Sequence, residues 1–512
     1  MSASEALTAD MPPPDMPHAA GKGGGKELNE PVTERADSML EFQKISKEEV
    51  VRFAPFFQEQ TKHISDFSLC FQFMWHKHFA PEYAIAEDCL VLKEIYAGKH
   101  WFHYPLSRTG NAAAERRAVE QIEEYCRDRE MRLHFTNVSE RDLLWLVLRY
   151  GQDVSITNIR RWRDYLYEAE AFCTYAGGNY AGQRNHVNKF KKLYPEWRFD
   201  EYRSQDEAEL VAFLHEYDAV QRAKKNYLAD EEMNEVYELV SQIGRFGLLC
   251  GVLRVGGKIV ACSVGERCGD MVVVHIEKAL RDYEGAYPMI ARQFALRFAS
   301  GGVKYLNRMD DAGDPGLRKS KLQYLPCELV GKYNVTPRRA IDAVAHLPEL
   351  HTPRLTLASV RDEDAAVYAR LAGDVARNRF WGYDWREDAP SAAPFDEWFL
   401  SFSRKLFRDK MELSLGIYVQ GALAGEVVLH RFGYTAQAEV GMRLLPEAEG
   451  NGYASEAVAA MCDYAFTRLE LECVEAKCFC ANERSARSLE RAGMRRSGKD
   501  EKYLYYRKTA KM

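Results

Sequence analysis

Apolar and polar positions alternate with two different periods near the C-terminus of the chain. Residues 438–445 (AEVGMRLL) alternate as a strand does, and the apolar residues that follow recur at helical spacing: Ala454, Ala457, Val458, Met461, Ala465 and Leu469. Residues 355–372 (LTLASVRDEDAAVYARLA) show the same order of strand, loop and helix. Between these stretches, residues 416–419 and 425–429 have the pattern of a hairpin around QGALA. These patterns predict an α/β fold with a mixed sheet.

The same patterns divide the chain into four segments. Residues 1–40 contain MPPPDMP and GKGGGK and few large apolar side chains, so we expect a disordered tail. Residues 41–338 are aromatic-rich and too long for one compact α/β unit, and the pattern predicts a joint near residue 155. Residues 339–353 contain prolines without a strong period, which indicates a linker before a last domain at 354–510. At roughly 150 residues per domain, the 512 residues suggest about three domain-sized units.

Composition and charge limit the class of protein. The hydrophobic share is 46% and the charged share 29%, which is typical of a soluble globular protein. With a net charge of −6, contact with nucleic acid would need a local basic patch. No apolar run approaches the roughly 18 residues of a membrane span and no secretory signal is visible, so we expect no integral membrane segment and a cytoplasmic location. The twelve cysteines lack the paired spacings of zinc sites, so we expect reduced core thiols and no metal.

The stretch PEAEGNGYASEA places two glycines directly before the predicted C-terminal helix. A helix N-terminus offers free N–H groups and the positive end of the helix dipole, while glycine allows positive φ and close approach of an anion. Gly450 and Gly452 therefore fit a phosphate or pyrophosphate site. The stretch lacks the Gly-Lys-Ser/Thr of a P-loop, and Ser455 stands where a dinucleotide fingerprint has its third glycine. For the glycine pair alone, a tight turn without a ligand is the favoured alternative.

A second strand-to-helix element follows about thirty residues later. CFCANERSARSLERAGM predicts a strand, an N-cap at Asn482 and a helix that ends at Gly493. Together, GMRLLPEAEGNGYASEA and NERSARSLERAGM resemble the GNAT family of acyl-CoA N-acyltransferases, and within it the branch of ribosomal-protein alanine acetyltransferases. The resemblance covers about residues 354–510. It implies a GNAT fold, acetyl-CoA as co-substrate and direct attack of an amine on the thioester.

The resemblance also implies roles for individual residues. Glu439 would be the general base, directly or through water, with an exposed strand carboxylate as the alternative. Ser485 or bulk water would protonate the leaving thiolate, because Leu489 stands where many family members have a tyrosine. Glu447 brings an anion near the phosphate site, which weakens binding unless the side chain points outward. Asn482 would contact the pantetheine arm of the coenzyme. Main-chain groups at the strand end and in the loop would hold the rest of it: Leu444, Gly450, Asn451, Gly452, Tyr453 and Ala454.

Polar residues interrupt apolar strands in the N-terminal region. The stretch VVVHIEKALRDYEGAY is a strand pattern broken by His275, Glu277 and Lys278. YLNRMDDAGDPGLRKSKLQYLP, at 305–326, predicts a strand, an acidic glycine-rich loop and a basic segment. Buried polar groups are costly unless paired, so we expect Glu277 to pair with Lys278 or Arg308. A buried structural network is the alternative to a reaction centre.

With DYLYEAEAF and QRNHVNKF, these stretches resemble the soluble C-terminal domain of phosphatidylglycerol lysyltransferases over about residues 41–338. The resemblance implies two tandem GNAT-like units, so that the chain would hold three, and transfer of an aminoacyl group from charged tRNA. The lipid enzymes add membrane helices, which this sequence lacks. The candidate site residues of this region are Arg184, Asn185, His275, Glu277, Lys278, Asn307, Arg308, Asp310 and Arg318.

Basic and aromatic residues beside QRNHVNKF have two interpretations. The basic residues would either meet tRNA phosphates or form a solvated helix face, which the net charge favours: Arg184, Lys189, Lys191, Lys192 and Arg198. The aromatic residues would either stack on a base or, as their spacing favours, pack in a core: Tyr165, Tyr167, Phe172, Tyr175 and Tyr180.

Three functional hypotheses follow. The leading one is acetyl-CoA-dependent N-acetylation of a primary amine on a protein, peptide or small molecule by the C-terminal domain. The second is tRNA-dependent aminoacyl transfer by the N-terminal region as the main activity. The third gives that region a non-catalytic role in substrate recognition. The acceptor amine and the oligomeric state do not follow from the sequence, because pocket shape decides specificity.

Overall fold

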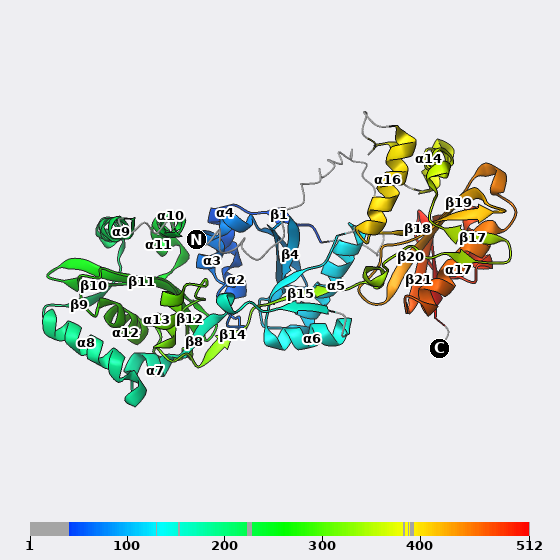
Figure 1. Cartoon of the computed structure of the whole chain (residues 1–512). Coiled ribbons are helices and arrows are strands. Elements are labelled where there is room, and N and C mark those ends of the chain that lie inside the picture. The colour runs from blue at the N-terminus through cyan, green and yellow to red at the C-terminus, as the bar shows by residue number, and fades with distance from the viewer. Residues whose placement is uncertain are drawn as a thin grey trace. The chain divides into compact units, whose positions relative to one another are not determined.

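The computed structural model describes residues 40–510 apart from 130, 152–153, 223–227, 382–384, 388 and 390–393. The predicted tail at 1–40 therefore lies outside the described residues except for Leu40. The chain folds into three mixed β-sheets with helices packed against them (Figure 1). The predicted α/β class with mixed sheets is thus confirmed.

The first sheet has the strand order β1-β2-β3-β4-β6-β15-β7, with β5 paired to β3. Its β4 and β6 run parallel, and β15 brings the chain back to this sheet after the second sheet is complete. The strands are β1 (Gln43–Lys44), β2 (Glu82–Ala86), β3 (Cys89–Tyr96), β4 (Lys99–His103), β5 (Leu106–Ser107), β6 (Phe135–Val138), β7 (Val154–Thr157) and β15 (Tyr333–Pro337). The helices of this part are α2 (Ala54–Phe57), α3 (Leu69–Met74), α4 (His76–Phe79), α5 (Ala112–Asp128) and α6 (Glu140–Tyr150).

The second sheet has the order β14-β8-β13-β12-β11-β10-β9. Its strands are β8 (Asp164–Glu168), β9 (Arg198–Glu201), β10 (Leu249–Val255), β11 (Lys258–Cys268), β12 (Met271–Ala279), β13 (Tyr305–Asn307) and β14 (Glu328–Val330). Helices α7 (Ala169–Thr174), α8 (Ala181–Leu193) and α12 (Ala286–Phe298) cover one face, and α9 (Glu207–Arg222), α10 (Leu228–Val240) and α11 (Ile243–Phe246) lie on the other (Figure 1). Helix α13 (Pro315–Leu322) follows β13.

Two apolar clusters fill the faces of the second sheet. Val187, Phe190 and Phe294 pack on the α8 and α12 face, and Leu210 and Phe213 pack on the α9 face. All five aromatic residues that were predicted to prefer core packing belong to the α8 and α12 cluster: Tyr165, Tyr167, Phe172, Tyr175 and Tyr180. The core interpretation is therefore confirmed over base stacking.

The third sheet has the order β16-β17-β18-β19-β20-β21-β23-β22. Its strands are β16 (Leu350–His351), β17 (Leu355–Ala358), β18 (Leu413–Val419), β19 (Ala422–His430), β20 (Gln437–Leu444), β21 (Cys473–Phe479), β22 (Arg495–Lys499) and β23 (Tyr503–Thr509). Helices α17 (Tyr453–Thr467) and α18 (Glu483–Arg491) share one core with the sheet, and α14 (Ala365–Ala372) and α16 (Phe395–Arg408) share another. Helix α15 (Val375–Trp381) precedes α16. Strand β16, which lies inside the predicted linker, pairs with β17.

The predicted hairpin around QGALA is present. Strands β18 and β19 pair antiparallel, and Gln420 and Gly421 form the turn with φ of 51° and 86°. Two positive φ angles at the centre of a two-residue turn match the right-handed twist of the strands. The sequence predicts this hairpin because a turn residue, Gly421, stands between two strand patterns.

The chain forms two compact units, one built mainly from residues before 337 and the other mainly from residues after it. Each unit has apolar clusters of its own, and we describe each separately. No helix within the described residues has both the length and the apolar character needed to cross a membrane.

Candidate functional sites

The glycine loop of the C-terminal unit has the backbone conformation that its sequence predicts. Gly450 and Gly452 have φ of 83° and 81°, a region that side chains other than glycine rarely adopt. Gly452 is the N-cap of α17, so the first free N–H groups of this helix face the loop. A Cβ built on Gly450 meets no atom within 4 Å, which leaves the approach to its backbone open. The loop therefore offers an anion both N–H groups and room.

Strands β20 and β21 separate just before this loop. Their parallel ladder pairs only Gln437–Glu439 with Cys473–Glu475, although β20 continues to Leu444 and β21 to Phe479. On its other side, β20 stays paired with β19 up to Leu444. The backbone of the last five residues of β20 therefore has no ladder partner on the β21 side. Backbone groups without a ladder partner can accept an extended ligand with amide groups, and we call the opening between the two strands the slot.

Arg354 lies against the glycine loop and was not singled out from the sequence. Its Nη1 donates to the carbonyl oxygen of Asn451 at 2.8 Å, and its guanidinium lies 5.1 Å from the ring centre of Tyr453. Arg354 also pairs with Glu456 in the first turn of α17 at 2.6 Å. The side chain is half exposed, so its positive charge adds to that of the helix terminus without closing the loop.

The two acidic side chains of the loop are paired with arginines. Glu447 Oε1 lies 2.6 Å from Nη2 of Arg370, and Glu449 Oε2 lies 2.6 Å from Nη1 of Arg484. These contacts neutralise both carboxylates locally. The Arg370 contact reduces the repulsion between Glu447 and a phosphate at the loop, although the pair is exposed to solvent.

Glu439 lies near the start of β20, on the strand face opposite the α17 core. Its carboxylate is 17% exposed and faces three cationic or titratable side chains: Arg431 at 3.5 Å, His430 at 3.9 Å and Lys477 at 3.9 Å. All three distances are too long for strong hydrogen bonds. The carboxylate oxygens therefore keep lone pairs for a further hydrogen-bond donor.

Asn482 caps α18, as the sequence predicts. Its Oδ1 accepts a hydrogen bond from the backbone N–H of Ser485 at 3.2 Å. The hydroxyl of Ser485 bonds the Cys478 thiol, whose pKa burial raises while this bond opposes the increase. Leu489 is 2% exposed and belongs to the apolar core, so this position holds no proton donor. The amide NH₂ of Asn482 has no role in the cap.

A buried polar cluster lies on the other face of the third sheet. Glu426 accepts hydrogen bonds from Tyr368 and Ser414, and Arg443 Nη2 pairs with it at 2.6 Å. A cavity of about 10 Å³ adjoins the cluster, and it is lined by Trp381, Phe399 and other aromatic residues. This volume holds about one water molecule. The sequence does not mark this cluster, because Glu426 and Arg443 face each other only through the β19–β20 register.

In the N-terminal unit, Glu277 pairs with Arg308, one of its two predicted partners. Arg308 Nη2 lies 2.7 Å from Glu277 Oε1, and the guanidinium lies 4.7 Å from the ring centre of Tyr324 and 5.5 Å from that of Phe172. Burial alone would lower the pKa of Arg308, but the Glu277 carboxylate and the surrounding tyrosines together outweigh it and raise this pKa. The buried ion pair is therefore held in place beside aromatic rings.

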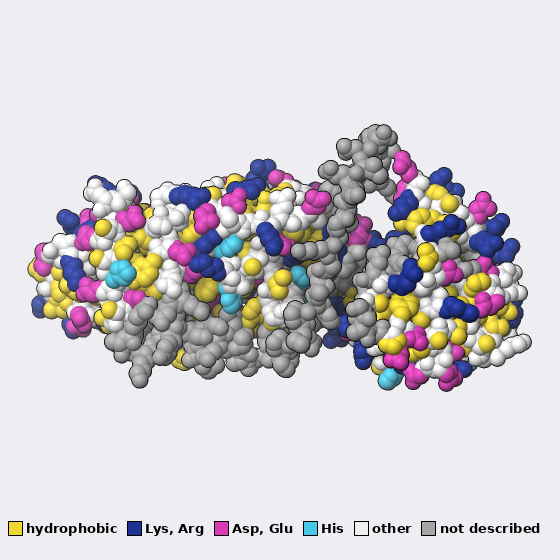
Figure 2. All heavy atoms as spheres, turned by 90° about the horizontal axis from the view of Figure 1, so that it is seen from above, with side chains coloured by type: hydrophobic (Ala, Val, Ile, Leu, Met, Phe, Trp, Pro, Cys, Tyr) yellow, Lys and Arg dark blue, Asp and Glu magenta, His cyan; other side chains and the backbone are white. Residues whose placement is uncertain are grey.

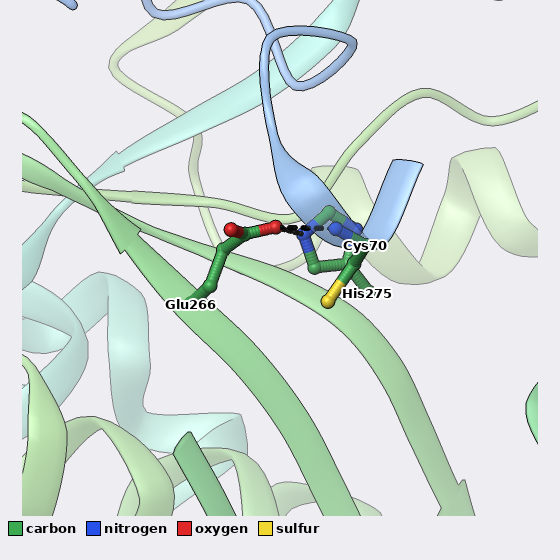
Figure 3. Close-up of side chains that lie close together, drawn as sticks. All are labelled: Cys70, Glu266 and His275. Atoms are coloured by element: carbon green, nitrogen blue, oxygen red, sulfur yellow. Dashed lines mark hydrogen bonds and ion pairs between the residues drawn. The ribbon is translucent and has the colours of Figure 1, made fainter. Parts of the chain in front are cut away.

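The other two polar residues of β12 point to the opposite face of the sheet. A bulge between Val264 and Gly265 of β11 leaves His275 without a register partner. His275 faces Cys70 and Glu266 (Figure 3). Lys278 lies 5.4 Å from the ring centre of Tyr217. The structure therefore separates His275 and Lys278 from Glu277, which the sequence had grouped together.

Asp310 belongs to a buried network of carboxylates and lysines. Lys332 Nζ lies 2.8 Å from Asp164 and 3.7 Å from Asp310 and also pairs with Asp66. Burial raises the pKa of Asp310 to about 6, although Lys332 acts in the opposite direction. Burial lowers the pKa of Lys321 to about 8, and its Nζ donates to the carbonyl oxygen of Arg308 at 2.6 Å. Two groups with pKa values near neutral pH thus lie on neighbouring segments, Asp310 in the loop after β13 and Lys321 on α13.

Asn307 and Arg318 flank this network. Asn307 is fully buried and donates to Asp164 at 3.0 Å and to the carbonyl oxygen of His63 at 2.8 Å. Arg318 makes two hydrogen bonds of 2.9 Å to Asp311. Burial acts to raise the pKa of Asp311, but the bonds from Arg318 and Tyr165 lower it to about 2. Asp311, Asp164, Lys321 and Lys332 were missed because nothing in their local sequence marks them as buried.

The basic stretch on α8 has local partners. Arg184 donates to the carbonyl oxygens of Tyr175 and Gly177 at the end of α7, and Lys189 pairs with Glu284 at 2.6 Å. Asn185 is exposed on α8, and no contact within the described residues joins it to Arg308. On the face shown in Figure 2, the described acidic and basic side chains are interspersed. The local partners of Arg184 and Lys189 favour a solvated helix face for α8.

Comparisons with known proteins match both parts of the chain. Residues 57–336 match the family described as "Phosphatidylglycerol lysyltransferase, C-terminal", and residues 354–495 match the family described as "Acetyltransferase (GNAT) domain". The chain belongs to the phosphatidylglycerol lysyltransferase C-terminal family and carries a GNAT acetyltransferase domain. Both resemblances inferred from the sequence are thereby confirmed.

Relatives of the GNAT domain come from Bacillus subtilis (strain 168). An uncharacterized N-acetyltransferase, YoaA, is 30% identical over 162 residues, which are 31% of this chain and 89% of YoaA. A putative ribosomal N-acetyltransferase, YdaF, is 31% identical over 120 residues, which are 23% of this chain and 66% of YdaF. The lysyltransferase-like part is similar to a solved protein of unknown function from Bacteroides thetaiotaomicron VPI-5482, with 25% identity, a TM-score of 0.54 and coverage of 58% of this chain and 99% of that one.

Proposed function

We propose that residues 354–510 transfer an acetyl group from acetyl-CoA to a primary amine. The observation that carries this proposal is the junction of β20, the glycine loop and α17, where two strands diverge directly before a helix N-terminus with two left-handed glycines. GNAT membership supports acyl transfer as the reaction class.

The co-substrate would bind along this junction. Its pyrophosphate would accept hydrogen bonds from the backbone N–H groups of the loop: Gly450, Asn451, Gly452, Tyr453 and Ala454. Its pantetheine arm would extend the hydrogen bonding of β20 near Leu444, in the slot that β21 leaves open. The amide NH₂ of Asn482 would donate to the arm from the other wall while its oxygen keeps the α18 cap.

Glu439 would serve as the general base. The amine attacks the thioester carbonyl, a C–N bond forms, the C–S bond breaks, and the amine proton passes to Glu439 directly or through water. Glu439 lies five residues before Leu444, about 17 Å along an extended strand, so the reacting thioester would lie between them, near Gly441. Main-chain N–H groups there would stabilise the oxyanion. Ser485 or water would protonate the thiolate.

The acceptor is a primary amine of a protein, peptide or small molecule. The name of YdaF, a putative ribosomal N-acetyltransferase, supports a protein amine as one class to test.

Substitution of the proposed base tests this function. Glu439→Gln in the full chain should lower kcat with acetyl-CoA and an amine acceptor by about 10²- to 10⁴-fold, because it removes the proton acceptor while leaving the loop intact. The KM for acetyl-CoA should stay unchanged. Release of free CoA thiol measures the rate.

Glu475→Gln is the matched control, because Glu475 is the register partner of Glu439 on β21. It should retain wild-type activity. Equal activity of the Glu439→Gln variant and this control would remove Glu439 from the mechanism, and no CoA release by the wild-type chain with any amine would reject the function.

A second candidate function, aminoacyl transfer from charged tRNA by the N-terminal unit, is favoured by a specific observation. The buried Arg308–Glu277 pair lies among aromatic rings, and the nearby Asp310 in the loop after β13 and Lys321 on α13 have pKa values of about 6 and about 8. Groups that titrate near neutral pH suit proton transfer to and from an amine. Membership of the lysyltransferase family supports an aminoacyl ester as donor.

Transfer of labelled lysine from lysyl-tRNA to an added amine tests this second function. Arg308→Ala should reduce transfer by more than tenfold, because the variant leaves Glu277 buried without its cation, while Arg297→Ala, on the exposed surface of α12, should not. Absence of transfer together with retained tRNA binding would instead favour a recognition role for this unit.

A further inference from the structure

Three side chains with different donor atoms converge inside the N-terminal unit. Cys70 comes from α3, Glu266 from β11 and His275 from the bulge of β12, so segments almost 200 residues apart meet at one point (Figure 3). One donor atom from each residue lies within 4.8 Å of the other two. The cluster lies in an apolar core that includes Phe73, Val264 and Ile276.

The imidazole of His275 lacks hydrogen bonds. Its side chain is 1% exposed, and neither ring nitrogen has a hydrogen-bond partner within the described residues. Its Nε2 lies 3.1 Å from Glu266 Oε1, but the geometry does not form a bond. Buried polar groups in folded proteins are nearly always bonded, so an unbonded ring that faces a carboxylate and a thiol points to a missing partner.

Glu266 is held in place independently of His275. Its two oxygens accept hydrogen bonds from the backbone N–H groups of Leu69 at 3.1 Å and Cys70 at 2.8 Å. Each carboxylate oxygen keeps a second lone pair, so these bonds leave Glu266 able to act as a ligand. They also fix the backbone of Cys70 beside the carboxylate.

We propose that Cys70, Glu266 and His275 bind a zinc ion. Thiolate, imidazole and carboxylate are the three ligand types that zinc takes in proteins, at about 2.0 to 2.3 Å, and tetrahedral zinc places its donors about 3.3 to 3.7 Å apart. The cluster reaches this spacing with shifts of about 1 Å, and water completes the fourth position. Because the cluster is closed, zinc enters as the chain folds and ties α3 to the second sheet.

The competing explanation is a protonated His275 that forms an ion pair with Glu266 beside an uninvolved thiol. The two explanations differ in what Cys70 does. A zinc site needs the Cys70 thiolate as a ligand, whereas the ion pair between His275 and Glu266 forms with or without it.

Zinc content of the purified full chain decides between them. Cells grown with zinc should yield wild-type protein with one zinc ion per chain after dialysis. Cys70→Ser should contain less than a tenth of that amount. Cys262→Ser is the matched control, since Cys262 is equally buried on β11 in the same apolar cluster, and it should contain as much zinc as the wild type. Wild-type protein without zinc, or equal zinc in the two variants, would overturn the proposal.

A second measurement uses the wild-type chain alone and holds even where Cys70→Ser fails to fold. Protein produced in cobalt-containing medium should show thiolate-to-cobalt charge-transfer absorption in the near ultraviolet, because Co²⁺ accepts the same ligands. Metal-loaded protein without this band would show that Cys70 is not a ligand, and the site would be rejected.

Discussion

Asp310, in the loop between β13 and α13, is expected to make the stability of the N-terminal unit depend on pH. Burial raises the pKa of Asp310 to about 6 from an ordinary value of 3.8, so the folded state binds this proton more tightly than the unfolded state does. The contribution to the free energy of unfolding is therefore present below pH 3.8 and is lost as the pH rises through about 6. Asp310 makes the chain less stable at pH 8 than at pH 4.

Replacement of this residue should reverse the loss. Asp310→Asn keeps an oxygen for the N–H of Ala312, which Asp310 accepts at 2.9 Å, and should stabilise the N-terminal unit by about 1 to 3 kcal/mol at pH 8 with no gain at pH 4. Urea denaturation at both pH values measures the difference. Asp282→Asn, on the exposed surface, should show no pH-dependent gain. A gain from Asp310→Asn that is the same at both pH values would contradict the pKa assignment.

Residue-scale partners were only partly visible in the sequence. The pairing of Glu277 with Arg308 follows from the rule that buried charges need partners, and both residues lie in strand patterns. His275 was visible as a polar break in an apolar strand, but its meeting with Cys70 and Glu266 was not, because that meeting depends on a β-bulge and on the packing of α3. Arg354 was missed for a related reason: it lies next to the glycine loop only after β17 joins the sheet.

At the scale of elements, the cap of α18 links stability to the proposed ligand contact. Asn482→Ala removes the acceptor for the Ser485 N–H, so it should destabilise the C-terminal unit by about 1 kcal/mol and also raise the KM for acetyl-CoA. Asn482→Asp keeps the acceptor but loses the NH₂ donor. It should preserve stability and still raise this KM several-fold. Thermal unfolding and steady-state kinetics measure the two effects, and an unchanged KM in both variants would exclude Asn482 from the coenzyme site.

Elements marked by several local sequence features were predictable, and the separation of strands β20 and β21 was not. The hairpin, the glycine loop and the capped helix α18 all appear where turn, glycine and cap residues coincide with a change of hydrophobic period. No local sequence feature marks the separation of β20 from β21, because their pairing joins residues that are far apart in the sequence. This opening is nevertheless the feature on which the proposal of a coenzyme site, rather than a tight turn without a ligand, rests.

At the scale of the whole molecule, the chain combines two units with separate apolar cores. Each unit contains the residues of one proposed activity, the glycine loop and Glu439 in one and the Arg308–Glu277 pair in the other. Loss of either activity through its own residues should therefore leave the other measurable in the same full-length protein. Acetyl-CoA binding is the step on which the leading proposal depends.

Calorimetric titration of the full chain with acetyl-CoA tests this binding most directly, with Gly450→Ala and Gly421→Ala as a matched pair. Both glycines have φ above 80° and no atom within 4 Å of a built Cβ, so alanine strains both turns alike, but only residue 450 lies on the proposed pyrophosphate path. We predict one site in the wild type, wild-type affinity in Gly421→Ala and at least tenfold weaker binding, about 1.4 kcal/mol, in Gly450→Ala. Equal affinities of the two variants, or no binding by the wild type, would contradict the account.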